Sequence, residues 1–199
     1  MQETATAAPG GPVYPVRFDV EYSENLSRWL IFVKWLLAIP HLIILYALWL
    51  VVYVIIVIAF FTILFTKKYP RGLFDFVVGV LRWQANVTAY VGLMRDEYPP
   101  FSWEPGKYPV TFEADYPQEL SRFGPWYKWL LIIPNLIVLI LVMLVAYVLW
   151  IIAFFAILFT GKFPRGMFDF IVGTLRWNAR ANAYAFDLLT DEYPPFSMK

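Results

Sequence analysis

The chain has 199 residues, a formal net charge of +1 and a composition that is 60% apolar and 20% aromatic. A soluble domain is typically about 45–50% apolar, and a domain of this length leaves roughly 30% of its unfolded-chain surface in solvent. The composition therefore predicts a membrane protein. The near-neutral charge gives no reason to expect a nucleic-acid partner. With no cysteine and a single histidine, His41, the chain lacks the residues for a thiolate or histidine metal site in both halves.

The first 13 residues are small, polar and rich in Pro and Gly. They lack a basic segment followed by an apolar one, so they do not resemble a signal peptide. We expect a disordered tail over residues 1–13.

Most of the remaining chain is duplicated. The run TKKYPRGLFDFVVGVLRW at 66–83 returns as TGKFPRGMFDFIVGTLRW at 160–177, which is 94 residues later, and the offset slips by one near the end, where Asp96 matches Asp191. A repeat of this length contains several structural elements. We therefore divide the chain into membrane module 1 (14–104) and membrane module 2 (105–199). A position kept polar in both copies is a candidate for a shared physical role.

Each module opens with a segment in which apolar and charged residues alternate, at 14–22 and again at 108–116. A period of two predicts a half-buried strand outside the hydrocarbon. Ser27 and Ser121 then follow as predicted helix N-caps.

The next run is apolar from Trp29 to Phe65, and its length exceeds the roughly 20 residues that cross a bilayer. Proline interrupts helices, so we expect helix kinks at Pro40 and Pro134. Residues 27–39 are then an amphipathic stub in the interface, with Lys34 reaching towards headgroups. Residues 41–65, and 136–159 in the copy, are predicted to cross.

A basic turn follows in each module and contains no acid. One interpretation is contact with anionic lipid headgroups, and the alternative is the ordinary positive flank of a membrane helix. The residues concerned are Lys67, Lys68, Arg71, Lys162 and Arg165.

The last element of each module is a helix at 73–94 and 167–188 with a narrow polar face. If these helices also span, each module crosses the membrane twice; if they lie in the interface, each crosses once and the modules are inverted. We favour two crossings, because the flanking segments can meet only on one side. Gly79 and Gly173 leave room for another helix to approach.

The polar face carries the sharpest candidates for function, because charges inside a membrane normally face a partner or water. Pairing Asp75 with Arg176 and Asp169 with Arg82 would form a polar seam between the modules. In the alternative, each Asp pairs with its own basic turn and each Arg locks helices together. The full seam comprises Asp75, Arg82, Asn86, Asp169, Arg176 and Arg180.

Each helix leads into a DEYPPFS segment, which double proline keeps out of a central strand. Its adjacent acids, Asp96–Glu97 and Asp191–Glu192, lack an accompanying nucleophile, metal ligand or glycine loop. We therefore expect no catalytic residues, no cofactor and no metal.

The run PRGxFDFxxGxLRW, preceded by a proline-containing apolar segment and followed by DEYPPFS, is present in both copies. It resembles a family of bacterial and archaeal membrane proteins of unknown function in which the module often occurs in tandem. The resemblance covers nearly the whole chain from Tyr14. It implies a multi-pass location in a prokaryotic cell membrane and no established activity.

These patterns together predict an all-α membrane protein. It would have two helical-hairpin modules, about four transmembrane helices, interfacial stubs and short extended segments at the surface. The function we expect is that of a non-enzymatic accessory or scaffold subunit, with membrane lipids and other membrane protein subunits as partners. Two alternatives stay open, namely a small oligomeric transporter or channel and a membrane-shaping hairpin protein.

Overall fold

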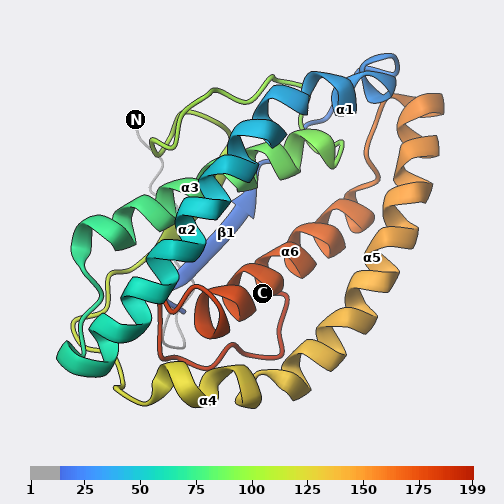
Figure 1. The fold of residues 1–199 in the computed structure, drawn as a ribbon. Helices are drawn as coiled ribbons and strands as arrows, with labels where there is room; N and C mark the ends of the chain where they lie inside the picture. Colours follow the sequence, from blue (N-terminus) through green and yellow to red (C-terminus); the bar gives the residue numbers. More distant parts are fainter. Residues whose placement is uncertain (1–13) are drawn as a thin grey trace, which may run out of the picture.

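The computed structural model describes residues 14–199, so the tail predicted over 1–13 lies outside the described residues. Each module contains a strand, a broken stub, a long helix and a shorter helix (Figure 1). The elements are β1 (Val16–Val20), η1 (Leu30–Phe32), α1 (Lys34–Leu37), α2 (Ile39–Thr66), α3 (Arg71–Val91), β2 (Val110–Ala114), α4 (Gly124–Leu131), α5 (Ile133–Thr160) and α6 (Arg165–Ala185). The DEYPPFS segments are extended but form neither a helix nor a strand.

The two predicted strands are confirmed, and they pair with each other across the module boundary. β1 and β2 form an antiparallel sheet of two strands with Phe18 opposite Phe112 at its centre. Alternation gives the sheet one apolar face, which includes both of these buried phenylalanines. The other face carries Arg17, which makes ion pairs with Glu113 at 3.2 Å and Asp115 at 2.8 Å, all partly exposed.

The inner helices pack on the strand of the opposite module, α3 against β2 and α6 against β1. Aromatic contacts repeat the exchange, because Phe74 meets Tyr116 edge to face at 5.1 Å and Phe168 meets Tyr22 at 5.0 Å between ring centroids. The two modules are therefore interlocked around one core and do not fold as separate hairpins side by side.

The two long helices form the outer layer, with α2 packed on α3 and α5 on α6. They run in opposite directions along two sides of the molecule (Figure 1). Each buries a narrow stripe of residues spaced three, four or seven apart, such as Val52, Ile55 and Ala59 in α2, and exposes apolar side chains elsewhere. This stripe is the pattern of a helix that packs through one face.

The expectation of about four transmembrane helices is wrong for the described residues. Two helices, α2 and α5, are long and apolar enough to cross a membrane. α3 and α6 have helical lengths of 21 residues each, but they carry charged and amide side chains along their length. Arg82 and Arg176, near the middle of these helices, bond to the sheet and to the segments that follow DEYPPFS, which ties both helices into the fold.

Each stub ends shortly before the proline that lies in the first turn of the long helix. η1 and α1 precede α2, and Pro40 occupies the first turn of α2, as Pro134 does in α5. Proline is tolerated there because the first-turn N–H groups have no partner within the helix. These prolines therefore begin the long helices instead of kinking them. Of the predicted caps, Ser27 accepts a bond from the Leu30 backbone N–H at 3.3 Å.

Gly79 and Gly173, which were predicted to admit a neighbouring helix, admit extended chain instead. A Cβ at Gly79 would lie 3.2 Å from the Trp103 side chain, and one at Gly173 would lie 2.7 Å from the Met198 Cβ. Both neighbours belong to the segments that follow DEYPPFS, which pack against the inner helices at these points.

Candidate functional site

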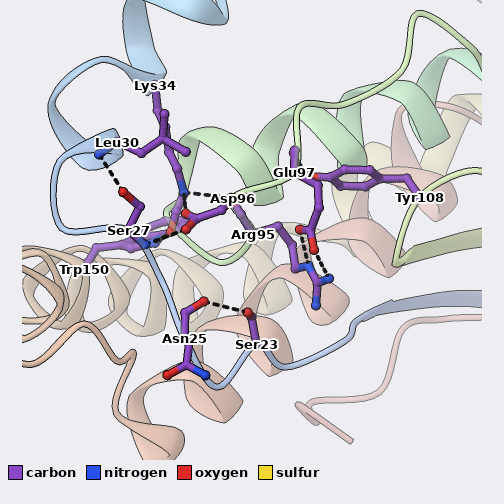
Figure 2. Close-up of polar contacts among 11 residues, drawn as sticks. Ser23, Asn25, Ser27, Leu30, Lys34, Arg95, Asp96, Glu97, Tyr108 and Trp150 are labelled. Carbon is purple, nitrogen blue, oxygen red and sulfur yellow. Dashed lines mark hydrogen bonds and ion pairs between the residues drawn. The ribbon is translucent and has the colours of Figure 1, made fainter.

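An ion pair with a buried lysine joins the stub to the DEYPPFS segment in each module, and Figure 2 shows the pair of the first module. Lys34 is 1% exposed, and its Nζ lies 2.7 Å from Asp96 Oδ1 while donating to the Arg95 carbonyl at 2.7 Å. The other Asp96 oxygen accepts the Ser27 backbone N–H at 2.5 Å. Lys34 therefore points into the protein, and the prediction that it reaches towards lipid headgroups is wrong.

The second module repeats this arrangement. Lys128 Nζ lies 2.6 Å from Asp191 Oδ1 and donates to the Thr190 carbonyl at 2.7 Å. Burial lowers the pKa of both lysines, and the aspartates oppose that shift. An ammonium so enclosed is held by complementary acceptors. The pairs fix the outer stubs to the fold, and their aspartates are fully engaged in doing so.

Arg82 and Arg176 join each inner helix to the strand of the other module. Arg82 donates through Nε to the Phe112 carbonyl at 3.0 Å and through Nη1 to the Trp103 carbonyl at 2.8 Å. Arg176 makes the same pair of bonds, to Phe18 at 2.7 Å and Met198 at 2.8 Å. The planar guanidinium holds two carbonyls in fixed directions.

The predicted polar seam does not assemble among the described residues. Asp75 lies 3.1 Å from Arg71 and Asp169 lies 3.7 Å from Arg165, in each case one helical turn away on the exposed surface. This arrangement matches the alternative in which each Asp pairs with its own basic turn.

The remaining members of the seam lie apart from these ion pairs. Asn86 is buried, whereas Arg180 donates to the Lys199 carbonyl at 2.5 Å and lies over the Tyr14 ring. The ion pair of Arg176 is with Asp19, at 2.8 Å. The seam residues therefore contact the sheet and the chain end and do not face each other between the modules.

The five residues of the basic turns are exposed, and lipid contact stays a prediction for them. Arg71 lies over the Tyr116 ring at 4.7 Å and Arg165 over the Tyr22 ring at 4.4 Å, so each turn is also braced by the opposite module. Lys67 lies 3.9 Å from Glu119, which is a weak exposed pair. The exposed Lys68 and Lys162 complete the set.

A polar cavity of about 180 Å³ lies between α3 and α6, above Phe18 and Phe112. Its polar wall carries a step of four residues from each inner helix and one acid just beyond α6: Gln84, Thr88, Asn178, Asn182 and Asp187. Asp187 is 3% exposed, and its carboxyl makes no hydrogen bond within residues 14–199. Burial raises the pKa of this carboxyl to about 7. The cavity therefore holds an acid that is largely neutral below that pH.

The sequence contained a signal for four of these residues. Gln84 and Asn178 are repeat mates, as are Thr88 and Asn182, so both positions stay polar in both copies. The predicted polar seam lies on a different set of positions, which includes Arg82 and Asn86. Asp187 carries no such signal, because it lies where the offset slips from 94 to 95. Leu93 and Leu188, on the far side of the slip, share the same left-handed backbone conformation.

No group of three or more His, Asp or Glu side chains with a metal-binding arrangement occurs in the described part of the chain. Each buried lysine donates to one backbone carbonyl and pairs with one aspartate. Burial and the nearby Asp187 raise the pKa of the Tyr69 hydroxyl.

The fold and the sites define a class, namely two interlocked tandem modules, each presenting a long apolar helix. Residues 28–102 and 122–198 each match the family described as Domain of unknown function (DUF4389), and the chain belongs to this family as two tandem copies. This confirms the resemblance at the level of the repeated module. No significant match to a curated protein or to a solved structure was found.

Proposed function

We propose that this is a non-enzymatic membrane protein that serves as an accessory or scaffold subunit for other membrane proteins. The exposed faces of α2 and α5 carry this proposal. Only 22% and 17% of their most apolar windows are buried, and at about 1.5 Å per residue each 28-residue helix is about 42 Å long. Apolar patches of that extent normally contact lipid or another protein.

Strand pairing restricts how these helices sit in a bilayer. β1 precedes α2 and β2 follows α3, yet Val20 pairs with Val110. Both strands must lie on one side of the membrane, so the chain between them crosses an even number of times. Between β1 and β2, α2 is the one candidate span. The chain between the strands can therefore cross twice only if α3 also crosses, and otherwise it does not cross.

A crossing by α3 is physically costly. Arg82, near the middle of α3, bonds to Phe112 at the centre of the sheet. If the middle of α3 lay at the bilayer centre, the charged outer face of the sheet, with Arg17 and Glu113, would lie there too. Each such charge costs on the order of 3 kcal/mol in hydrocarbon. We therefore propose no crossing, with α2 and α5 embedded in one leaflet and the sheet facing water.

This arrangement can be tested by cysteine labelling, because the chain contains no cysteine. Arg28→Cys lies just before the stub that leads into α2, and Lys68→Cys lies just after the end of α2. Thr111→Cys lies on the exposed face of the sheet. An impermeant maleimide should label all three from one side of sealed membranes. Val54→Cys, midway along the exposed face of α2, should react only after detergent is added. Opposite-side labelling of Arg28→Cys and Lys68→Cys would show that α2 spans.

The subunit proposal has a separate test. We would extract the protein from native membranes in a mild, lipid-preserving detergent, separate it by size and identify co-migrating proteins by mass spectrometry. The proposal predicts a membrane protein partner in fixed stoichiometry. A free protein that carries only lipid would contradict it.

The one-leaflet arrangement also favours one alternative, a membrane-shaping role. A protein that fills one leaflet expands that monolayer relative to the other. Addition to liposomes should then narrow or tubulate them in proportion to the bound protein, and unchanged liposome diameter at high occupancy would remove this alternative.

A further inference from the structure

An open apolar groove runs between the two modules on their outer side. Its volume is about 880 Å³, and α2, the end of α3 and α5 all contribute to it. Trp49 donates its indole N–H to Gln84 at 2.7 Å, and Trp150 donates to the Gly92 carbonyl at 2.7 Å. Both rings therefore have their polar atom satisfied by the protein, and they help line the groove with apolar surface. The volume is within the range of small-molecule pockets, roughly 300–1,000 Å³.

The groove adjoins the polar cavity between α3 and α6. Trp49, Gln84 and Thr88 line both spaces. The two spaces therefore lie on either side of a shared wall, and a ligand that occupied both would pass beside the bonded pair Trp49 and Gln84. The combined site is apolar at its outer end, between α2 and α5, and carries polar side chains at its inner end, between α3 and α6.

Hydrogen-bonding capacity in the cavity decides what kind of polar end fits. The Gln84 oxygen already accepts from Trp49, which leaves its amide N–H groups to donate. The Asn178 oxygen accepts from Asn182 at 2.5 Å, which likewise leaves the Asn178 amide N–H groups. A neutral Asp187 adds an O–H donor. These donors can bind a ligand carbonyl oxygen, while the Asn182 side-chain oxygen and the Thr88 hydroxyl remain as acceptors on the same wall.

Charge excludes the ionic alternatives. Neither the groove nor the cavity is lined by Lys or Arg, so a phosphate or carboxylate would be buried without a counter-charge, which is strongly unfavourable. An ammonium would find one acid, but it would also face the two amide N–H donors.

We propose that this site binds an uncharged lipid, with its hydrocarbon chain in the groove and a carbonyl-bearing end, such as an ester, in the cavity beside Asp187. The proposal rests on the membrane association proposed above in one respect, since the ligand reaches the groove from lipid.

The test uses purified protein in detergent micelles, so it does not depend on how the protein sits in a bilayer. The probe is a long-chain fatty-acid methyl ester with a photoactivatable diazirine in its chain. Matched probes are a hydrocarbon of the same length with the same diazirine, and a phosphate-headed lipid with the same labelled chain. We expect the ester to label groove residues such as Tyr147 and Ile151, with competition by unlabelled ester.

Variants separate the polar end from the chain. Asp187→Asn keeps an N–H donor and should retain at least half of the ester labelling. Asp187→Leu together with Gln84→Leu should reduce it at least fivefold, while hydrocarbon labelling stays unchanged. Ile151→Trp, which fills the groove, should reduce labelling by both probes. Thermal midpoints would show that each variant is folded.

Equal labelling by ester and hydrocarbon that none of these variants alters would overturn the site and indicate general detergent-phase contact. Stronger labelling by the phosphate-headed probe would overturn the proposed ligand class. Release of the protein from membranes by alkaline extraction would instead contradict the proposed membrane function. The labelling result in micelles would still decide whether the lipid site exists.

Discussion

Phe18 lies directly opposite Phe112 in the sheet, and the two residues occupy the same position in the two copies of the repeat. A residue that pairs with its own repeat mate in an antiparallel ladder marks a pseudo-two-fold axis through the pair. The axis explains why α3 packs on β2 and α6 on β1, because each interaction is the image of the other. It also places α2 and α5 as antiparallel partners flanking one groove.

The arginines that bond to this sheet should contribute strongly to stability. Replacing Arg82 and Arg176 together with Leu removes two backbone-directed bonds at each site and leaves the Phe112 and Phe18 carbonyls of the sheet without a side-chain donor. We expect a loss of about 1–3 kcal/mol per site with membrane insertion unchanged, measured as a lower thermal midpoint in detergent. Arg71→Leu on the exposed surface is the matched control. A double variant as stable as the parent would contradict this role.

The buried ion pair between Lys34 and Asp96 should be more sensitive to substitution than the exposed pairs. Asp96→Asn leaves the buried Lys34 ammonium without its counter-charge, and removing one partner of such a pair costs on the order of 3 kcal/mol. Asp75→Asn disrupts an exposed pair within α3 and should cost less than about 1 kcal/mol. Chemical denaturation in micelles compares the two, and equal effects would argue against the structural role of the buried pair.

The cavity acid Asp187 should make stability fall as pH rises. Burial raises the pKa of its carboxyl from 3.8 to about 7 in the folded protein, so between these values the folded state holds a proton that the unfolded state has released. Folding is therefore favoured below about pH 4 and loses up to about 4 kcal/mol as pH approaches 7. Thermal midpoints of the parent and Asp187→Asn across this range check the prediction. An identical pH dependence in both proteins would contradict it.

His41 should be replaceable by the residue its own repeat mate uses. Trp83 donates its indole N–H to His41 Nδ1 at 3.0 Å, and Trp177 donates to the Asn135 side-chain oxygen at 2.9 Å. His41→Asn keeps an acceptor for Trp83 and should change stability by less than about 1 kcal/mol. His41→Leu leaves that N–H unpaired and should cost about 1–3 kcal/mol. If both variants were equally destabilised, stacking of His41 on Phe101, at 4.0 Å between centroids, would be the dominant interaction.

The sequence predicted the local elements well, because periodicity and punctuation are local properties. Alternation over residues 14–22 and 108–116 identified both strands, and the uninterrupted apolar runs identified α2 and α5. The repeat at a fixed offset identified the two modules, which the family match confirms. The repeat also indicates four of the cavity positions, because Gln84 and Asn178 are polar repeat mates, as are Thr88 and Asn182.

What the sequence by itself determined was therefore the duplication, the strands, the long apolar helices and the lack of cysteine or repeated histidine. Only the tertiary structure decided which charges meet. Asp96 and Asp191 looked like exposed acids but neutralise buried lysines, whereas Asp75 and Asp169 looked intramembrane but lie on the surface beside Arg71 and Arg165. The reason is physical: partners of buried charges are set by contacts some 60 residues apart, and the pairing of Phe18 with Phe112 across modules restricts which helices can cross a membrane.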